Sequence, residues 1–236
     1  MNEMKDFVYQ SARMLPVILL LDGSGSMELN NRIGVMNRAV REMLESFKRS
    51  SNTIASISVA IITFSGTSAR IHLPMTAVDE LDLDALQDMT AHGSTPMGEA
   101  ISLAKGMIED KEQISSRAYR PTVVLVSDGK PMDQWRQPLQ AFKEEGRSAK
   151  CYRMAMGIQV DPASEAYEVL RCFASDEEQV FDGSDAGEIG KFFQYVTMST
   201  TARIRTADPN AVPTMEEVFA QPVLADDGGD EDDFPF

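Results

Sequence analysis

The chain has 236 residues, of which 43% are apolar and 25% are charged, and its formal net charge is −15 at pH 7. This composition is typical of a globular protein and is sufficient for one domain with a full hydrophobic core. The negative charge disfavours direct binding to nucleic-acid phosphates and to anionic membrane surfaces. The longest apolar run is far shorter than the roughly 18 residues that a membrane span needs. We therefore expect neither nucleic acid nor membrane as a direct partner.

Cysteine content and the first residues favour a cytoplasmic location. The two cysteines, Cys151 and Cys172, form neither a disulfide framework nor a C-x-x-C pair. The first residues, MNEMKDFVYQSARM, lack the apolar segment that follows the charges of a secretory signal. A reducing cytoplasm fits both observations.

The first part of the chain predicts a strand, a helix and a hairpin. The continuous apolar run over 17–22 is typical of a parallel strand covered on both faces. Apolar residues at helical spacing predict a helix over 29–47. Residues 56–65 predict a second strand, and the turn GTSA leads into a third strand at RIHLPM.

Two helices are predicted next. DLDALQDM, residues 82–89, predicts a short helix, and a longer one follows over 95–114. In the longer helix, Pro96 lies just inside the start and Thr95 is a suitable N-cap.

The second half of the chain continues the alternation of strands and helices. In chain order we predict a strand over 121–129, a helix over 134–146, a strand over 150–158, a helix over 162–173, a short strand over 179–183 and a helix over 185–198. This alternation favours an α/β fold with right-handed crossovers. We predict a doubly wound, Rossmann-like and mostly parallel sheet of order 3-2-1-4-5-6, with one antiparallel edge strand and helices on both faces.

The periodic pattern stops after about residue 200. Residues 201–236 hold nine acidic and two basic residues and four of the eleven prolines. High charge with few core residues predicts disorder. We therefore divide the chain into an N-terminal extension at 1–13, one domain at 14–200 and a flexible acidic tail at 201–236.

Two predicted strands end on carboxylates, Asp22 and Asp128. Ligands of open α/β sheets bind beyond the carboxyl ends of the strands, where the strand order reverses. If the first and fourth strands are neighbours, both carboxylates meet there. Ser24 and Ser26 add two hydroxyls in the loop after Asp22. Oxygen donors without histidine or thiol favour a hard cation, Mg²⁺ above all.

The same residues carry a resemblance to a known family. The D-x-S-x-S sequence at 22–26, Thr95 in GSTPMGEA and Asp128 in VSDG resemble the complete metal-ion-dependent adhesion site of a von Willebrand factor type A domain. The resemblance covers about residues 14–200 and includes all five positions in the family's order.

The resemblance implies how the metal is held and what it binds. The serines, and at times the threonine, bind the ion directly, whereas the aspartates bind directly or through water. An Asp or Glu carboxylate of a protein partner then completes the shell of Mg²⁺, for which Mn²⁺ or Ca²⁺ could substitute. The implied ligands are Asp22, Ser24, Ser26, Thr95 and Asp128.

Within that family, LPVILLLDGSGSM and GSTPMGEAI are most similar to bacterial TerY-like proteins of tellurite-resistance and stress operons. This similarity implies a cytoplasmic interaction module, not an enzyme, in a stress-response or phage-defence system. Its implied partners include operon-encoded kinases or phosphatases. Gly23 is a departure, since several relatives carry another small residue there.

The segment DEDDFPF, residues 230–236, is a second candidate binding element. It resembles the C-terminal tip of bacterial single-stranded-DNA-binding protein, in which the last Phe fills a pocket on genome-maintenance enzymes and the acidic run steers it to a basic rim. The alternatives are a solvated tail that aids solubility and a tail carboxylate that reaches the metal of a neighbouring molecule. By analogy with the tip, the partner-binding residues are Asp230, Glu231, Asp232, Asp233, Phe234, Pro235 and Phe236.

Two rival functions stay open. One is a hydrolase or phosphatase that uses the same metal to activate water, although no positioned base is evident and neither G-x-S-x-G nor G-x-x-x-x-G-K-[ST] occurs. His92 near Thr95 leaves a serine–histidine nucleophile pair open, with a simple loop histidine as the alternative. The other rival is a recruiter of DNA-repair enzymes that acts through the tail while the metal is structural.

Overall fold

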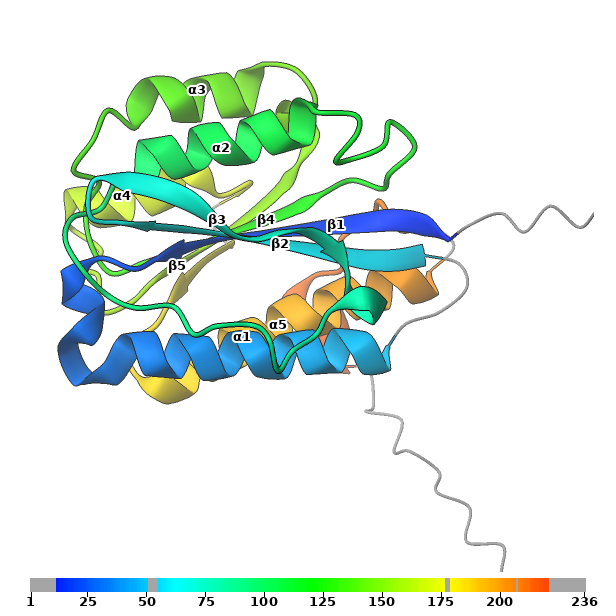
Figure 1. Cartoon of the computed structure of the whole chain (residues 1–236), viewed down its shortest axis with the longest axis horizontal. Coiled ribbons are helices and arrows are strands. Elements are labelled where there is room, and N and C mark those ends of the chain that lie inside the picture. The colour runs from blue at the N-terminus through cyan, green and yellow to red at the C-terminus, as the bar shows by residue number, and fades with distance from the viewer. Residues whose placement is uncertain (1–11, 51–54, 177–178, 207, 221–236) are drawn as a thin grey trace, which may run out of the picture.

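A six-stranded sheet forms the centre of the molecule. The computed structural model describes residues 12–50, 55–176, 179–206 and 208–220. The strand order is β3-β2-β1-β4-β5-β6, and only β2 and β3 pair antiparallel (Figure 1). This confirms the predicted order and the antiparallel edge strand. The strands are β1 (Arg13–Asp22), β2 (Ala55–Ser65), β3 (Ser68–Ala77), β4 (Thr122–Ser127), β5 (Tyr152–Gly157) and β6 (Val180–Asp182).

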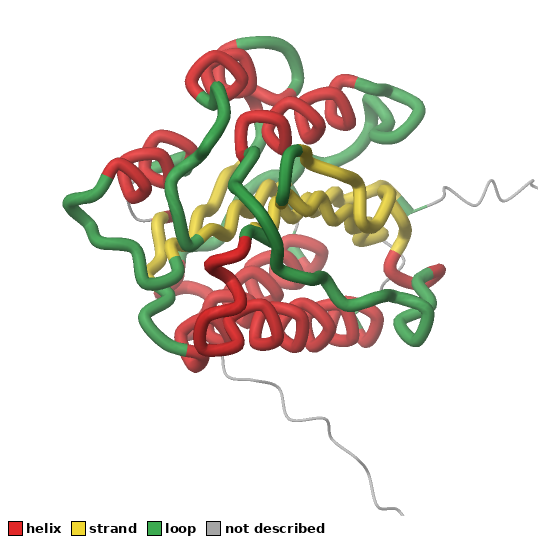
Figure 2. The backbone as a smooth tube through the Cα atoms, turned by 60° about the vertical axis from the view of Figure 1, so that its left-hand side comes forward, coloured by secondary structure: helices red, strands yellow, loops and turns green. Residues whose placement is uncertain are grey.

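Helices cover both faces of the sheet and complete three layers (Figure 2). Helices α1 and α5 lie side by side on one face, and α2, α3 and α4 lie on the other (Figure 1). The helices are α1 (Arg32–Arg49), α2 (Met97–Glu109), α3 (Arg136–Glu144), α4 (Glu165–Phe173), α5 (Ala186–Arg205) and α6 (Met215–Ala220), with short 3₁₀ turns at Gly25–Asn31, Val78–Glu80 and Ser148–Lys150. Within the described ranges, no helix combines the length and the hydrophobicity that crossing a bilayer requires.

Strand β1 shows why the apolar run at 17–22 forms a central strand. It pairs with β2 on one side and β4 on the other. Its side chains alternate between the two cores: Leu19 packs on the α1 and α5 side, and Leu20 packs on the α2, α3 and α4 side. Because both faces are covered, every position of the strand centre is buried and apolar.

Helix α1 begins at Arg32, three residues later than the apolar spacing predicts. Asn30 and Asn31 have φ values of 52° and 57°, in the left-handed region that interrupts a right-handed helix. Asparagine tolerates this conformation better than most residues do. The segment from Gly25 to Asn31 is therefore not part of α1: it begins as a 3₁₀ turn, is kinked at Leu29 and Asn30, and carries the chain from the end of β1 into α1.

The helix predicted over 82–89 is wrong. The Asp82 carboxylate accepts hydrogen bonds from the backbone N–H groups of Asp84 (3.0 Å) and Ala85 (3.3 Å), which forms a side-chain-capped turn. Arg41 on α1 also donates to the Leu83 carbonyl at 2.5 Å. Side chains thus satisfy the backbone groups that a helix would have paired internally.

Helix α2 ends at Glu109, five residues earlier than predicted. Asp110 leaves the helix in an extended conformation. Its carboxylate accepts from the backbone of Glu112 and from the side chain of Gln113, both at 2.9 Å. These local bonds replace the helical ones and begin the loop that leads to β4.

The folded domain extends beyond the boundary predicted at residue 200. Helix α5 continues to Arg205, and Val218 of α6 is buried in the core on the same face. The Arg203 side chain is 0% exposed and donates to the Pro209 carbonyl and the Thr122 hydroxyl, both at 2.7 Å. A buried arginine thus links the segment after α5 to the start of β4 by hydrogen bonds. A search for apolar periodicity cannot detect such a link. The predicted tip at 230–236 lies outside the described residues.

Candidate metal centre

The candidate site lies where the strand order reverses. Strands β1 and β4 are parallel neighbours, and from them the chain continues in opposite directions across the sheet, through α1 on one face and α3 on the other. Asp22 is the last residue of β1, and Asp128 follows the last residue of β4. The two carboxylates therefore meet at the switch point, as predicted.

Hydrogen bonds join four of the five predicted residues. The Ser24 backbone N–H donates to Asp22 Oδ1 at 2.8 Å, and the hydroxyls of Ser24 and Ser26 lie 3.1 Å apart. Ser26 Oγ donates to Asp128 Oδ1 at 2.6 Å. The structure thus brings two carboxylates and two hydroxyls, from two strand ends, into one contiguous group of oxygens.

Ser127 is a member of the site that the sequence interpretation missed. It is fully buried and donates its hydroxyl to Asp22 Oδ2 at 2.5 Å. Together with the Ser24 N–H, it holds both oxygens of Asp22 in place. The one available signal was its position immediately before Asp128, at the end of the strand.

Asp22 is a carboxylate that the fold makes costly to ionise. Its side chain is fully buried, and this burial raises its pKa from 3.8 to about 6. Hydrogen bonds from Ser127 and Ser24 oppose the rise, and the charge of Asp128 adds to it. A cation bound beside Asp22 would stabilise the charged form and offset its lost hydration.

Arg32 is the second residue that the sequence interpretation missed. Its Nη1 donates to Asp128 Oδ2 at 2.7 Å, and the two side chains are 13% and 0% exposed. A second guanidinium nitrogen bonds Gln159, which lies at a left-handed φ of 53°, and the buried Nε has no partner. Two carboxylates and one guanidinium thus give the site a formal charge of −1. Nothing in the local sequence pattern marked the first residue of α1 for this role.

A glycine contact brings the loop before α2 to the site. Gly25 donates its N–H to the Gly93 carbonyl at 2.9 Å. Gly93 has a φ of 65°, and a side chain there would begin 2.4 Å from the Gly66 Cα. Only glycine permits the loop before α2 to approach the turn between β2 and β3 this closely. Thr95 follows two residues later and is therefore held near the serines.

The Thr95 hydroxyl does not cap α2, contrary to the prediction. Pro96 occupies the N-cap position, and the proline side chain cannot accept a hydrogen bond. The carboxylate of Asp133 caps the helix instead, because it accepts from the N–H groups of Gly98 (3.0 Å) and Glu99 (2.9 Å). Thr95 is 6% exposed, and its hydroxyl bonds to no other described residue. That hydroxyl is therefore available to a ligand.

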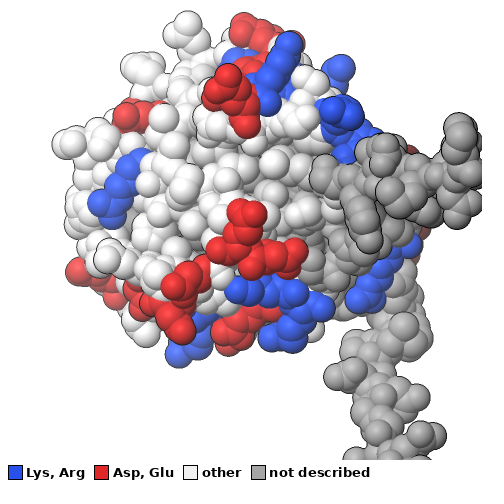
Figure 3. Space-filling view, turned by 45° about the vertical axis from the view of Figure 1, so that its right-hand side comes forward, with Lys and Arg blue, Asp and Glu red and all other residues white. Residues whose placement is uncertain are grey.

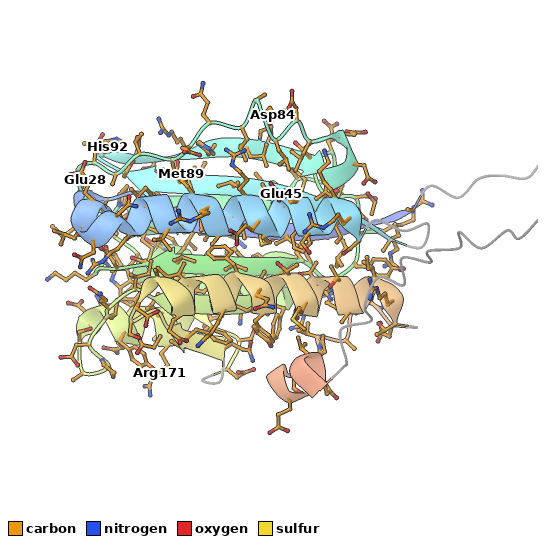
Figure 4. The ribbon with its side chains drawn as sticks, turned by 90° about the horizontal axis from the view of Figure 1, so that it is seen from below. Glu28, Glu45, Asp84, Met89, His92 and Arg171 are labelled. Atoms are coloured by element: carbon orange, nitrogen blue, oxygen red, sulfur yellow. The ribbon has the colours of Figure 1, made fainter. Side chains whose placement is uncertain are left out.

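His92 lies at the rim, at the same end of the molecule as Glu28 (Figure 4). Its Nε2 is 3.3 Å from the Ser65 hydroxyl, longer than the usual separation of a nucleophile and its base. The ring makes no hydrogen bond to a carboxylate in the described part of the chain. The serine–histidine pair thus lacks the group that orients the base in hydrolases.

A cavity of about 440 Å³ opens beside Asp128. Its lining mixes both signs of charge, so it suits a polar partner surface next to the metal position. In the described ranges, no group of three or more His, Cys, Asp or Glu side chains is placed to hold a metal. The lining residues are Asp128, Lys130, Gln159, Val160, Asp161, Ser164, Glu165 and Ala166.

The fold is the Rossmann-like fold of a von Willebrand factor type A domain, with its oxygen-rich site at the switch point. Residues 17–130 match the von Willebrand factor type A domain family model. This range includes the D-x-S-x-S loop, Thr95 and Asp128.

Known proteins with this fold include adhesins and a matrix protein. The pilus adhesin SpaC from Lactobacillus rhamnosus GG superposes with a TM-score of 0.64 at 16% identity, over 80% of this chain and 30% of that one. The von Willebrand factor domain of the type V pili tip protein Mfa5 from Porphyromonas gingivalis gives 0.62 at 11% identity, over 84% and 98%. Proximal thread matrix protein 1 from the mussel byssus, with a zinc-occupied MIDAS motif, gives 0.61 at 14% identity, over 81% and 48%.

One curated relative is also similar in sequence. An uncharacterized protein of Mycobacterium tuberculosis is 29% identical over 140 residues, which are 56% of this chain. The similarity spans only 21% of that relative's length.

Proposed function

We propose that this chain is a von Willebrand factor A-type interaction module, which binds Mg²⁺ and uses it to hold an Asp or Glu carboxylate of a protein partner. The observation that carries the proposal is the hydrogen-bonded group of carboxylate and hydroxyl oxygens at the switch point, which is buried at Asp22 and Ser24 and open to solvent at Ser26. The proposed metal-binding residues are Asp22, Ser24, Ser26, Thr95 and Asp128.

The donor chemistry fits a hard divalent cation. All five side chains offer oxygen, and Mg²⁺ takes six oxygen ligands at roughly 2.0–2.1 Å. Neutral hydroxyls leave the ion electron-poor, so an anionic sixth ligand is favoured. Mn²⁺ or Ca²⁺ would serve as substitutes. The zinc-occupied motif of the mussel protein supports a divalent ion at this position of the fold.

The proposed role is binding without catalysis, in a bacterial stress-response or defence system. The TerY-like sequences around Asp22 and Thr95 support this setting, in which kinases or phosphatases are candidate partners. The rival hydrolase needs a base beside the metal, and His92 instead contacts Ser65. Both cysteines are free thiols, which supports the proposed reducing cytoplasm.

Direct metal binding is the first test. Calorimetric titration of Mg²⁺ and Mn²⁺ into the full chain should show one site, and Ser24→Ala/Ser26→Ala should lose it. The matched control is Ser115→Ala/Ser116→Ala, two exposed serines in the loop between α2 and β4, at the opposite end of the strands. Equal metal binding by the wild type and the Ser24/Ser26 variant would refute the proposed site.

Partner capture from native lysate tests the use of the metal. A specific partner should bind the wild-type chain in Mg²⁺ and be lost both in EDTA and with Ser24→Ala/Ser26→Ala. A chain without residues 234–236 should retain the partner. Capture that survives loss of the metal ligands but not loss of these three residues would instead favour the tail as the recruiting element.

A further inference from the structure

A cleft of about 570 Å³ lies at the opposite end of the sheet from the candidate metal centre. It is formed by the loop between α2 and β4, the turn before β5 and the segment after α5. Its lining contains four cations and no carboxylate, in a chain whose net charge is −15. The cations are Lys111, Arg120, Arg147 and Lys150.

The positive charges of this basic cleft are not neutralised by ion pairs. None of the four cations forms a salt bridge with a carboxylate in the part of the chain that the structure describes. Arg147 donates to the carbonyls of Ile108 (2.5 Å) and Ile114 (2.7 Å), and Arg120 Nε donates to the Lys150 carbonyl at 2.8 Å. Carbonyls orient these guanidinium groups but leave their charge in place.

The floor of the basic cleft is apolar. Ile108, Ala118, Tyr119 and Pro121 contribute to its lining. Arg13 lies over the Tyr119 ring, 4.2 Å from its centroid, and adds a fifth positive charge at the edge. Figure 3 brings the right-hand side of Figure 1 forward and shows basic side chains on this face, several of them next to acidic ones. The cleft therefore suits a ligand that combines carboxylates with apolar side chains.

We propose that the acidic C-terminal segment of this chain, residues 226–236, docks in its own basic cleft. This segment contains six carboxylates, no lysine or arginine, and two phenylalanines next to the acidic run. Its charge opposes that of the cleft, and its aromatic side chains match the apolar floor. The carboxylates are Asp226, Asp227, Asp230, Glu231, Asp232 and Asp233.

The covalent path allows this contact. Asn210 lines the cleft, and its side chain accepts from the Arg120 N–H at 2.8 Å. The chain from Asn210 to Met215 spans at most about 18 Å, and α6 adds about 8 Å. Ala220 therefore lies within roughly 26 Å of Asn210, whereas the thirteen steps from Ala220 to Asp233 reach up to about 45 Å.

Carbodiimide crosslinking of the full native chain tests the proposal. This reagent joins a carboxylate to a lysine amine only when the two are in contact. We expect intramolecular crosslinks from residues 226–233 to Lys111 and Lys150, identified by mass spectrometry. They should disappear at about 0.5 M NaCl, where the screening length is a few ångströms.

Lys130 and Lys143 are the control amines. Lys130 lies beside the candidate metal centre, and Lys143 is on α3. Crosslinks that spread evenly over all lysines, that favour Lys130, or that are absent would overturn the proposal. Crosslinks between molecules would assign the cleft to the segment of a second copy and would also overturn docking within one chain.

Charge reversal gives an independent readout. In Lys111→Glu/Lys150→Glu, cleavage after Glu231 by a glutamate-specific protease should be at least threefold faster than in the wild type. The matched control is Arg38→Glu/Arg49→Glu on α1, which should leave this rate unchanged. Equal cleavage rates in the wild type and the cleft variant would count against docking.

Discussion

Asp22 shows how burial changes the ionisation of a single residue at the candidate metal centre. Its pKa is raised to about 6 because the side chain is buried. The folded chain therefore takes up a proton more readily than the unfolded chain, in which the pKa is near 3.8. The resulting stabilisation is complete below pH 4 and is lost as the pH rises through 6. The difference between the two pKa values corresponds to roughly 3 kcal/mol.

Asp22→Asn should therefore stabilise the metal-free protein at pH 7, by about 1–3 kcal/mol, while abolishing metal binding. The amide can be accommodated, because Ser127 Oγ also lies 3.2 Å from the Gly129 carbonyl and can donate there instead. Urea unfolding in EDTA at pH 4, 5, 6 and 7 measures the effect. Asp84→Asn, at an exposed carboxylate (Figure 4), is the control. A pH dependence that is the same in wild type and Asp22→Asn would contradict the assignment.

Arg32 gives a second prediction at this scale. Its guanidinium competes with the metal for Asp128 and repels any dication nearby. Arg32→Gln should therefore bind Mn²⁺ on the order of tenfold more tightly, or about 1.4 kcal/mol. The metal-free protein should lose roughly 3 kcal/mol of stability, since the buried Asp128 loses its partner.

Mn²⁺ titration followed by electron paramagnetic resonance measures this affinity without any partner. Arg38→Gln, at an exposed arginine of the same helix, should behave as wild type. Weaker Mn²⁺ binding by Arg32→Gln than by the wild type would show that the arginine supports the metal instead of opposing it.

At the scale of elements, α2 depends on a cap that comes from a distant part of the chain. Asp133, in the loop after β4, binds the first two free N–H groups of α2. Its carboxylate also favours this end of the helix dipole. The same loop is joined to the residue before the N-cap, because the Met132 N–H donates to the Thr95 carbonyl at 2.9 Å. The position of Thr95 at the candidate metal centre is thus linked to the β4–α3 loop.

Asp133→Ala should cost about 1–2 kcal/mol of stability and should weaken metal binding through Thr95. The amides of Gly98 and Glu99 should exchange hydrogen faster, which NMR can detect directly. Asp133→Asn should restore part of the stability because it keeps one acceptor. Unchanged exchange at these two amides would show that the cap does not hold the helix start.

At the scale of the whole molecule, the hydrophobic core and the buried hydrogen bonds of the domain are complete only when the segment after α5 is included. Arg203 fixes this segment to Arg120 and Thr122, and Val218 completes the core beside α5. A chain ending at residue 200 lacks both. It should be destabilised by at least about 3 kcal/mol, because buried polar groups lose their partners.

A chain ending at residue 220 should unfold within about 1 kcal/mol of the full chain when both are measured at about 0.5 M NaCl, where charge contacts are screened. Arg203→Met tests the same contact without truncation and should also be destabilised. Equal free energies of unfolding for chains ending at 200 and 220 would support the domain boundary at residue 200 that the sequence predicts.

The sequence by itself determined the succession of strands and helices along the chain and the polar residues at the two strand ends, Asp22 and Asp128. These follow from local properties: an apolar run, a helical period, and the polar residues that directly follow a strand. The helix predicted over 82–89 was wrong because the side chains of Asp82 and Arg41 form hydrogen bonds with the backbone of that segment. The predicted Thr95 cap was wrong because the carboxylate of Asp133 accepts from the first free N–H groups of α2 instead.

Only the tertiary structure decided what surrounds the candidate metal. Ser127 reaches Asp22 across 105 positions, and Arg32 reaches Asp128 across 96. The fold also decided that residues 201–220 belong to the domain. Such pairings depend on which segments pack together in space, and no periodicity along the chain encodes them.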